Sequence, residues 1–138
     1  ENTEGAGTYR GGIGTIREFA FEAPGRVSIE GDGSKYPPWG FAGGDDGSPG
    51  AVVVEEEIDE STPRSKMSNK GMTAGQWIRS VGPSGGGWGD PHDREPAQVR
   101  ADVLDGLISR ERAAATYGVV LTDDLEIDDS ATAARREA

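Results

Sequence analysis

The chain has 138 residues, a formal net charge of −11, 22 glycines and no cysteine. Its acidity argues against nucleic-acid binding, because neutralising phosphates requires clustered Lys and Arg, and the 14 basic residues are scattered. The lack of cysteine excludes disulfides and thiolate metal sites. Only 33% of the chain is hydrophobic, so we expect a thin core and a chain that needs a partner to bury its apolar surface.

Other features of the composition favour a folded protein. Three tryptophans and several Val/Ile runs argue against disorder, which requires few aromatic and β-branched residues. No apolar run approaches the length that spans a bilayer, and no signal-peptide pattern opens the sequence. We therefore expect a cytoplasmic protein without membrane association.

Glycine and proline divide the sequence into two parts. Twenty of the 22 glycines and all eight prolines lie at or before Pro96. In this first part, short β-branched or aromatic runs stand between turn residues, which is typical of strands. We predict strands over Thr15–Phe21, Arg26–Glu30, Ala51–Ile58 and Gln76–Val81.

After Pro96 the apolar residues recur with a helical period. This pattern predicts a helix that begins near Pro96. Its apolar face comprises Val99, Val103, Leu104, Leu107 and Ile108. Further along, Ser109 is a candidate N-cap for a short helix through Ala113–Tyr117, which Gly118 can end.

The rest of the sequence predicts one extended segment and a last helix. Val119–Leu121 reads as a strand or an extended return, and Asp129 or Ser130 is a candidate cap for an Ala/Arg-rich terminal helix. We therefore predict a mainly β fold with a C-terminal α-helical tail, irregular, glycine-rich and partner-dependent. A glycine-rich β module over residues 1–90 and a helical tail over 91–138, packed on it, would form one structural unit.

The stretch from Gly82 to Pro96 has three possible interpretations: a phosphate cradle, a metal corner or a structural hinge. Phosphate loops need glycines at set places before a helix, but no G-x-G-x-x-G pattern is present and acidic residues precede the helix. A metal site would use Asp90, His92 and Asp93, yet the sequence has no second histidine. Acids that complement a helix N-terminus explain these residues better, so we predict no metal site.

Three other segments are candidate sites. Glu55–Glu60 lacks the alternating ligands of a calcium loop and is better explained as a solvated acidic edge. In the rigid loop Pro37–Gly44, Trp39 and Phe41 either meet a partner or cap the chain's own core. Lys66 is the best single candidate for contacting an anion or a carbonyl group. The sequence contains no convincing set of residues for nucleophilic catalysis.

Several segments, in order along the chain, resemble the hydantoinase B/oxoprolinase family. The likeness covers most of the sequence and is most specific between Gly85 and Leu121. It matches only the C-terminal portion of the family's large B-type subunit, so no catalytic residue is carried over. The segments are Gly5–Phe21, Pro37–Gly44, Ser65–Lys66, Gly85–Pro91 and Val99–Leu121.

The resemblance implies a small structural and assembly subunit of a multi-subunit ATP-dependent carboxylase acting on a ketone of the acetophenone or acetone type. It would complete a hydantoinase B-like large subunit. The partners would be larger hydantoinase A-like and B-like subunits, which would bind ATP and a divalent metal. This chain itself would hold no cofactor. Candidate interface or pocket-edge residues are Trp39, Phe41, Lys66, Gly86, Gly87, Trp88 and Asp90.

Two alternatives remain open at this point. The first is that the chain is a C-terminal fragment of an ATP-dependent hydantoinase or 5-oxoprolinase that hydrolyses a cyclic amide. The second belongs to a different functional class: the chain would be a free-standing acidic β module that binds a small ligand through Trp39 and Trp88. Related members of one family run both hydrolysis and carboxylation, so likeness alone does not separate the carboxylase from the hydrolytic enzyme.

Overall fold

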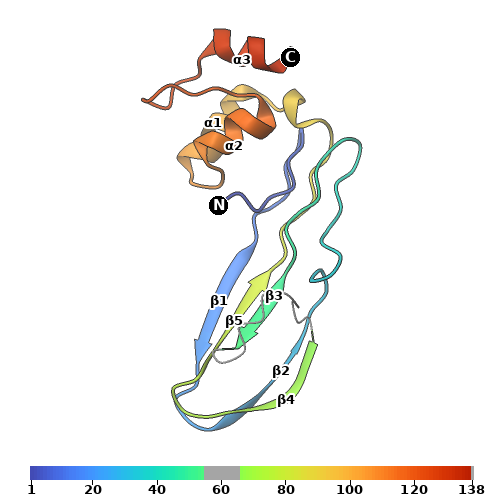
Figure 1. Ribbon diagram of the computed structural model, residues 1–138, viewed down its shortest axis with the longest axis vertical. Helices are drawn as coiled ribbons and strands as arrows, with labels where there is room; N and C mark the ends of the chain where they lie inside the picture. Colours follow the sequence, from blue (N-terminus) through green and yellow to red (C-terminus); the bar gives the residue numbers. More distant parts are fainter. Residues whose placement is uncertain (55–65, 138) are drawn as a thin grey trace.

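The computed structural model describes residues 1–54 and 66–137. It consists of two small antiparallel sheets followed by three α-helices (Figure 1), as the predicted fold class requires. One sheet has the strand order β1-β5-β3 and the other pairs β2 with β4. The strands are β1 Thr15–Ala20, β2 Gly25–Glu30, β3 Ala51–Val54, β4 Lys66–Met72 and β5 Trp77–Gly82.

The strand predictions are largely confirmed. β1, β2 and β5 begin and end within a residue of the predicted ranges. The third range is confirmed over Ala51–Val54, and the remainder, like the acidic stretch Glu55–Glu60, lies outside the described residues. β4 was not predicted, because it contains Gly71 and an Asn69 with φ of 53° and carries no β-branched residue.

The helices follow in the order predicted. They are a short 3₁₀ turn, η1, at Pro91–Asp93, then α1 Pro96–Leu104, α2 Arg110–Tyr117 and α3 Asp129–Arg136. Ser109 caps α2 by accepting a hydrogen bond from Arg112 N–H at 3.1 Å, and Gly118 ends the helix with φ of 66°. Both caps were predicted.

Two helix details differ from the prediction. The cap of α3 is Asp128, not Asp129 or Ser130, because its Oδ1 accepts from Ala131 N–H at 2.9 Å. α1 ends at Leu104, since Gly106 with φ of 69° turns the chain. Leu104, which was predicted on the apolar face, is 53% exposed and lies outside the helical cluster. None of the helices in the described part of the chain is long and apolar enough to cross a membrane.

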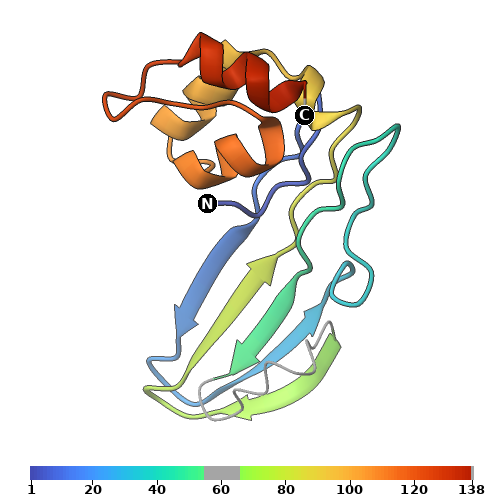
Figure 2. The ribbon, with the colours of Figure 1, turned by 45° about the horizontal axis from the view of Figure 1, so that its top comes forward.

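Two separate apolar clusters lie at opposite ends of the molecule. The sheets enclose a small cluster around Val54, Met72 and Ile78. The helices enclose a larger one. Between them run three extended segments, residues 5–14, 40–50 and 83–90, which we call the neck (Figure 2). The helical cluster consists of Ala6, Val99, Ile108, Ala113, Tyr117, Val119 and Leu121.

In the neck, backbones lie directly against one another. Gly5 N–H donates to Gly85 O at 2.9 Å, Asp45 N–H to Ala6 O at 2.7 Å, and Gly87 N–H to Asp45 O at 2.9 Å. A Cβ added at Gly87 would stand 1.9 Å from Ala6 O. Glycine is therefore required at position 87, because a Cβ there would collide with the backbone of the neighbouring segment.

A buried ion cluster ties the first neck segment to α1. Asp102 is 5% exposed, and its Oδ2 accepts from Nε and Nη2 of Arg94 at 3.2 and 3.0 Å. Arg10 Nε lies 2.9 Å from Asp102 Oδ1 as an ion pair. Arg94 also donates to Thr8 O at 3.1 Å. Removing one partner from such a cluster would leave a buried charge uncompensated.

A second buried cluster fixes the N-terminal residues against α2. The Glu4 side chain is fully buried, and Arg112 Nε donates to its Oε1 at 2.6 Å. Tyr117 Oη donates to the same oxygen at 3.1 Å. Burial, together with the charge and hydrogen bond of Glu4, raises the pKa of Tyr117 far above its ordinary value. Residues 4–10 thus pack with the helices; the unit boundary at residue 90 stays a prediction.

We predict that Gly87→Ala destabilises the protein by about 1–3 kcal/mol, because the added Cβ meets backbone atoms that cannot move independently. Gly12→Ala is the matched control in the same neck, since a Cβ there would meet nothing within 4 Å. Urea unfolding of both variants measures the difference. Equal destabilisation of the two would contradict the packing argument.

Tyr117 gives a pH-dependent prediction. Above the ordinary tyrosine pKa of about 10 the unfolded chain loses the phenolic proton while the native state keeps it, so the free energy of unfolding falls as pH rises. In Tyr117→Phe, the fall between about pH 8 and pH 11 should be smaller by about 1 kcal/mol. Denaturant unfolding at both pH values tests this. Tyr36→Phe, at an exposed position, is the control, and the same fall in both variants would refute the assignment.

Candidate interaction site

Aromatic side chains from all three neck segments gather around Trp88. On one side, Trp88 and Tyr9 exchange backbone hydrogen bonds of 2.9 and 3.0 Å, and their ring centroids lie 5.6 Å apart. On the other side, Phe41 N–H donates to Gly87 O at 2.9 Å, and Phe41 O accepts from Gly89 N–H at 3.0 Å. Directly paired residues in neighbouring strands present their side chains on the same face. Tyr9, Trp88 and Phe41 therefore form one row across the neck.

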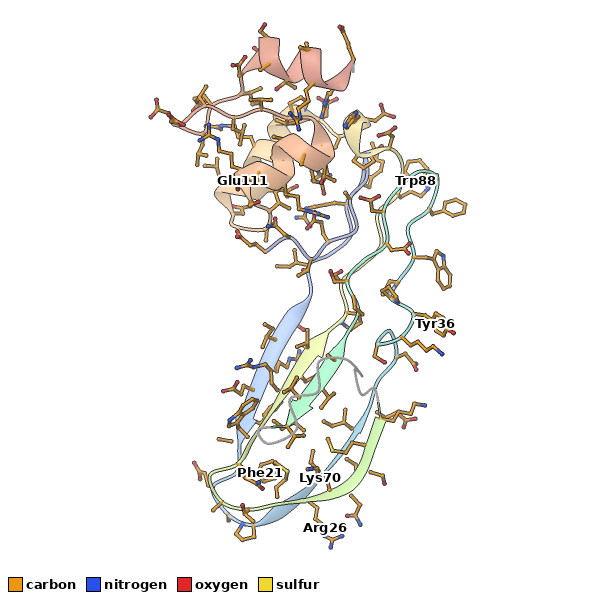
Figure 3. The ribbon with its side chains drawn as sticks, in the orientation of Figure 1. Phe21, Arg26, Tyr36, Lys70, Trp88 and Glu111 are labelled. Atoms are coloured by element: carbon orange, nitrogen blue, oxygen red, sulfur yellow. The ribbon has the colours of Figure 1, made fainter. Side chains whose placement is uncertain are left out.

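The row continues into the residues that directly precede the second neck segment. We call the resulting surface the aromatic ridge: Tyr9, Tyr36, Trp39, Phe41 and Trp88. Their exposed fractions are 66%, 75%, 78%, 67% and 50%, respectively. Figure 3 shows Trp88 and Tyr36 on the same side of the molecule. The one aromatic residue of the helical cluster is Tyr117. Most of the large rings thus lie outside the cores, and an exposed apolar surface of this kind is typical of interaction sites.

The glycines of the Gly82–Pro96 stretch hold the ridge in place. A Cβ on Gly86 would stand 2.1 Å from Trp39 O, so this glycine lets the Trp39 segment approach the Trp88 segment. Gly85 and Gly87 donate their N–H groups to Gly12 O and Asp45 O at 2.8 and 2.9 Å. Since these donors are used within the neck, they do not point at an anion, and the hinge interpretation fits better than the phosphate cradle.

Five of the predicted site residues lie in the aromatic ridge or directly beneath it. Trp39 and Phe41 belong to neither apolar cluster, so they do not cap the chain's own core. The rings of Trp39 and Trp88 are largely exposed rather than enclosed, which does not favour the small-ligand alternative. The role of these residues at an interface stays a prediction. The five are Trp39, Phe41, Gly86, Gly87 and Trp88.

The other two predicted residues, Asp90 and Lys66, do not belong to the ridge. Asp90 Oδ1 caps η1 by accepting from His92 N–H at 2.8 Å. Lys66 lies on β4, where Nζ forms an exposed ion pair with Glu30 at 3.3 Å. Within residues 1–54 and 66–137, no group of three or more His, Cys, Asp or Glu residues is arranged to hold a metal ion.

Sequence reasoning missed Tyr9 and Tyr36 as ridge residues. Tyr9 lies 79 positions before Trp88, and nothing local in the sequence announces their pairing. The available signal was the alternation of glycine with other residues over residues 5–11, which is typical of closely approaching backbones.

Comparisons with known proteins identify relatives over nearly the whole chain. The B subunit of a putative D-/L-hydantoinase from Pseudomonas sp. (strain NS671) is 47% identical over 130 residues, covering 93% of this chain and 22% of that protein. The beta subunit of the caprolactamase from Pseudomonas jessenii is 35% identical over 144 residues, covering 97% and 24%. The chain thus spans about a quarter of the length of these relatives.

Solved structures show the same fold. The crystal structure of ATP-dependent caprolactamase from Pseudomonas jessenii superposes with a TM-score of 0.71 at 30% identity, over 97% of this chain and 24% of that one. A nucleotide-free structure of acetone carboxylase gives a TM-score of 0.69 over 98% and 23%. At 24% identity, this second likeness shows the fold alone.

A family model described as hydantoinase B/oxoprolinase matches residues 1–91 of the 138. The match includes the glycine-rich neck and both sheets, and therefore the whole aromatic ridge. The chain belongs to the hydantoinase B/oxoprolinase family.

Proposed function

We propose that this chain is part of the B-type subunit of an ATP-dependent enzyme that hydrolyses a cyclic amide. The observation that carries the proposal is the 47% identity to the B subunit of a putative hydantoinase, supported by the 35% identity to the beta subunit of a caprolactamase. The rings that the names of these relatives indicate, hydantoin and caprolactam, both contain an amide bond. Cyclic amides are therefore the substrate class.

On this proposal the chain supplies assembly surface rather than catalytic side chains. Its single histidine, His92, packs at the end of α2, where a Cβ on Gly118 would stand 3.4 Å from Nε2. The exposed aromatic ridge supports a docking role, because Trp and Tyr are enriched at interfaces. ATP and a divalent metal would be bound by the remainder of the B-like subunit and by a larger hydantoinase A-like partner subunit, in the cytoplasm.

The second candidate is the small assembly subunit of an ATP-dependent ketone carboxylase of the acetophenone or acetone type. It is supported by the structural likeness to acetone carboxylase, which extends over 98% of this chain. We place it second because that likeness carries 24% identity, whereas the hydantoinase relative carries 47%.

An activity measurement separates the two candidates. We predict that the purified enzyme containing this chain hydrolyses ATP when given hydantoin, ε-caprolactam or 5-oxoproline, with opening of the ring. Neither acetone nor acetophenone should be carboxylated from labelled bicarbonate. Ring-opened product is measured by mass spectrometry and phosphate release by colorimetry. Incorporation of label into a ketone, without ring opening, would favour the carboxylase instead.

The ridge can be tested by one substitution and a matched control. Trp88→Ala should weaken association of this chain with the rest of the enzyme by at least about tenfold, as removal of an interface tryptophan commonly does. Leu104→Ala, an exposed apolar residue on α1, should leave association unchanged. Native mass spectrometry over a dilution series reports the assembled fraction. Equal behaviour of the two variants would exclude the ridge as the docking surface.

A further inference from the structure

Among residues 1–54 and 66–137, no strand pairs with the outer edge of β1. β1 pairs with β5 on one side, and in the described sheet order β1-β5-β3 it has no neighbour on the other. All six of its residues are exposed, and two of them, Ile16 and Phe19, are large apolar residues with exposed fractions of 69% and 56%. Figure 1 shows β1 at the margin of the sheet.

The strand register shows which backbone groups face outward. Phe21 N–H donates to Gln76 O at 2.8 Å, and the same register pairs Phe19 with Ile78 and Arg17 with Ser80. Hydrogen bonding alternates along an antiparallel pair, so the odd-numbered residues of β1 bond to β5. The N–H and C=O groups of Ile16, Glu18 and Ala20 therefore point away from the sheet.

β1 carries few of the devices that normally protect an edge. Exposed edges are usually blunted by Pro, Lys, bulges or an overlying element. The sequence Thr-Ile-Arg-Glu-Phe-Ala contains no Pro, Gly or Lys, and its pairing with β5 is regular throughout. By contrast, the register of β2 with β4 shifts between Val27 and Ile29. The β1 edge is thus competent to pair with another strand.

A second copy of this chain is a poor occupant of that edge. The backbone groups of even-numbered residues point outward in both copies. Antiparallel self-pairing must therefore place an even-numbered residue of one copy opposite an even-numbered residue of the other. The two registers that use most of the strand then place Glu18 opposite Glu18 or Arg17 opposite Arg17. Like charges directly opposite one another destabilise a strand pair. The edge therefore suits a strand of different sequence.

We infer that the outer edge of β1 receives an extended strand from the enzyme's polypeptide outside this segment. Backbone groups of Ile16, Glu18 and Ala20 would bond to that strand, and its apolar residues would cover Ile16 on one face and Phe19 on the other. The inference rests on the proposed function only in placing the chain inside a larger assembly, since its relatives are about four times as long. It holds for hydrolysis and carboxylation alike.

A proline substitution at one position tests the backbone bond itself. Glu18→Pro removes an outward N–H without removing a bond to β5. Glu18→Ala is the control, because it removes the same carboxylate, which pairs with Arg79 at 2.7 Å, but keeps the N–H. In the purified enzyme, Glu18→Pro should lower the affinity of this chain for the rest of the enzyme at least about tenfold relative to Glu18→Ala. Equal association of the two variants would overturn the inference.

Hydrogen–deuterium exchange on the unmodified enzyme gives an independent answer if Glu18→Pro fails to fold. The peptide spanning Thr15–Ala20 should exchange at least about tenfold more slowly in the assembly than in the separated chain. Equal exchange in both states would show an open edge and refute the strand pairing. If the separated chain forms a homodimer and Glu18→Pro abolishes it, β1 pairs with a second copy of itself, and the inference of a donated strand is wrong. Neither measurement depends on catalytic activity, so the strand pairing can be refuted independently of the proposed function.

Discussion

Direct backbone contact between three neck segments is the constraint on which the rest of this structure depends. Where Gly87 faces Ala6 O and Gly86 faces Trp39 O, no Cβ can be accommodated. The interior of the neck is consequently made of peptide groups that satisfy one another's hydrogen bonds. Only small side chains such as those of Ala6 and Ser84 are buried in these segments, and the large aromatic side chains lie on the outside. The exposed aromatic ridge is thus a consequence of the same packing that joins the sheets to the helices.

The two apolar clusters are small, and the two ends of the molecule differ in the interactions that supplement this limited apolar burial. At the helical end, the ion clusters centred on Asp102 and Glu4 fix the first residues of the chain against α1 and α2. At the sheet end, the cluster around Ile78 is covered by short strands, and no strand in the described part of the chain pairs with the outer edge of β1. The ridge and this edge are the two surfaces that a larger enzyme would cover. Because only 33% of the chain is hydrophobic, burial of these surfaces against a partner would raise its stability.

Local signals in the sequence predicted the local structure well. Ser109 and Gly118 predicted both ends of α2, because a cap is decided by a few neighbouring residues. Contacts between distant residues were not predictable: the pairing of Tyr9 with Trp88 depends on how the neck assembles. β4 was missed because pairing with β2, rather than β propensity, makes Lys66–Met72 a strand. The family resemblance was confirmed, whereas the interface residues remain predictions that the chain alone does not test.

If the aromatic ridge is a docking surface, it becomes buried when the enzyme assembles. Hydroxyl-radical footprinting with residue-resolved mass spectrometry measures this directly, because aromatic side chains are oxidised in proportion to their exposure. We expect strong protection of Trp39, Phe41 and Trp88 in the assembled enzyme relative to the separated chain, with Leu104 oxidised equally in both states. Equal oxidation of the ridge residues in the two states would contradict the account.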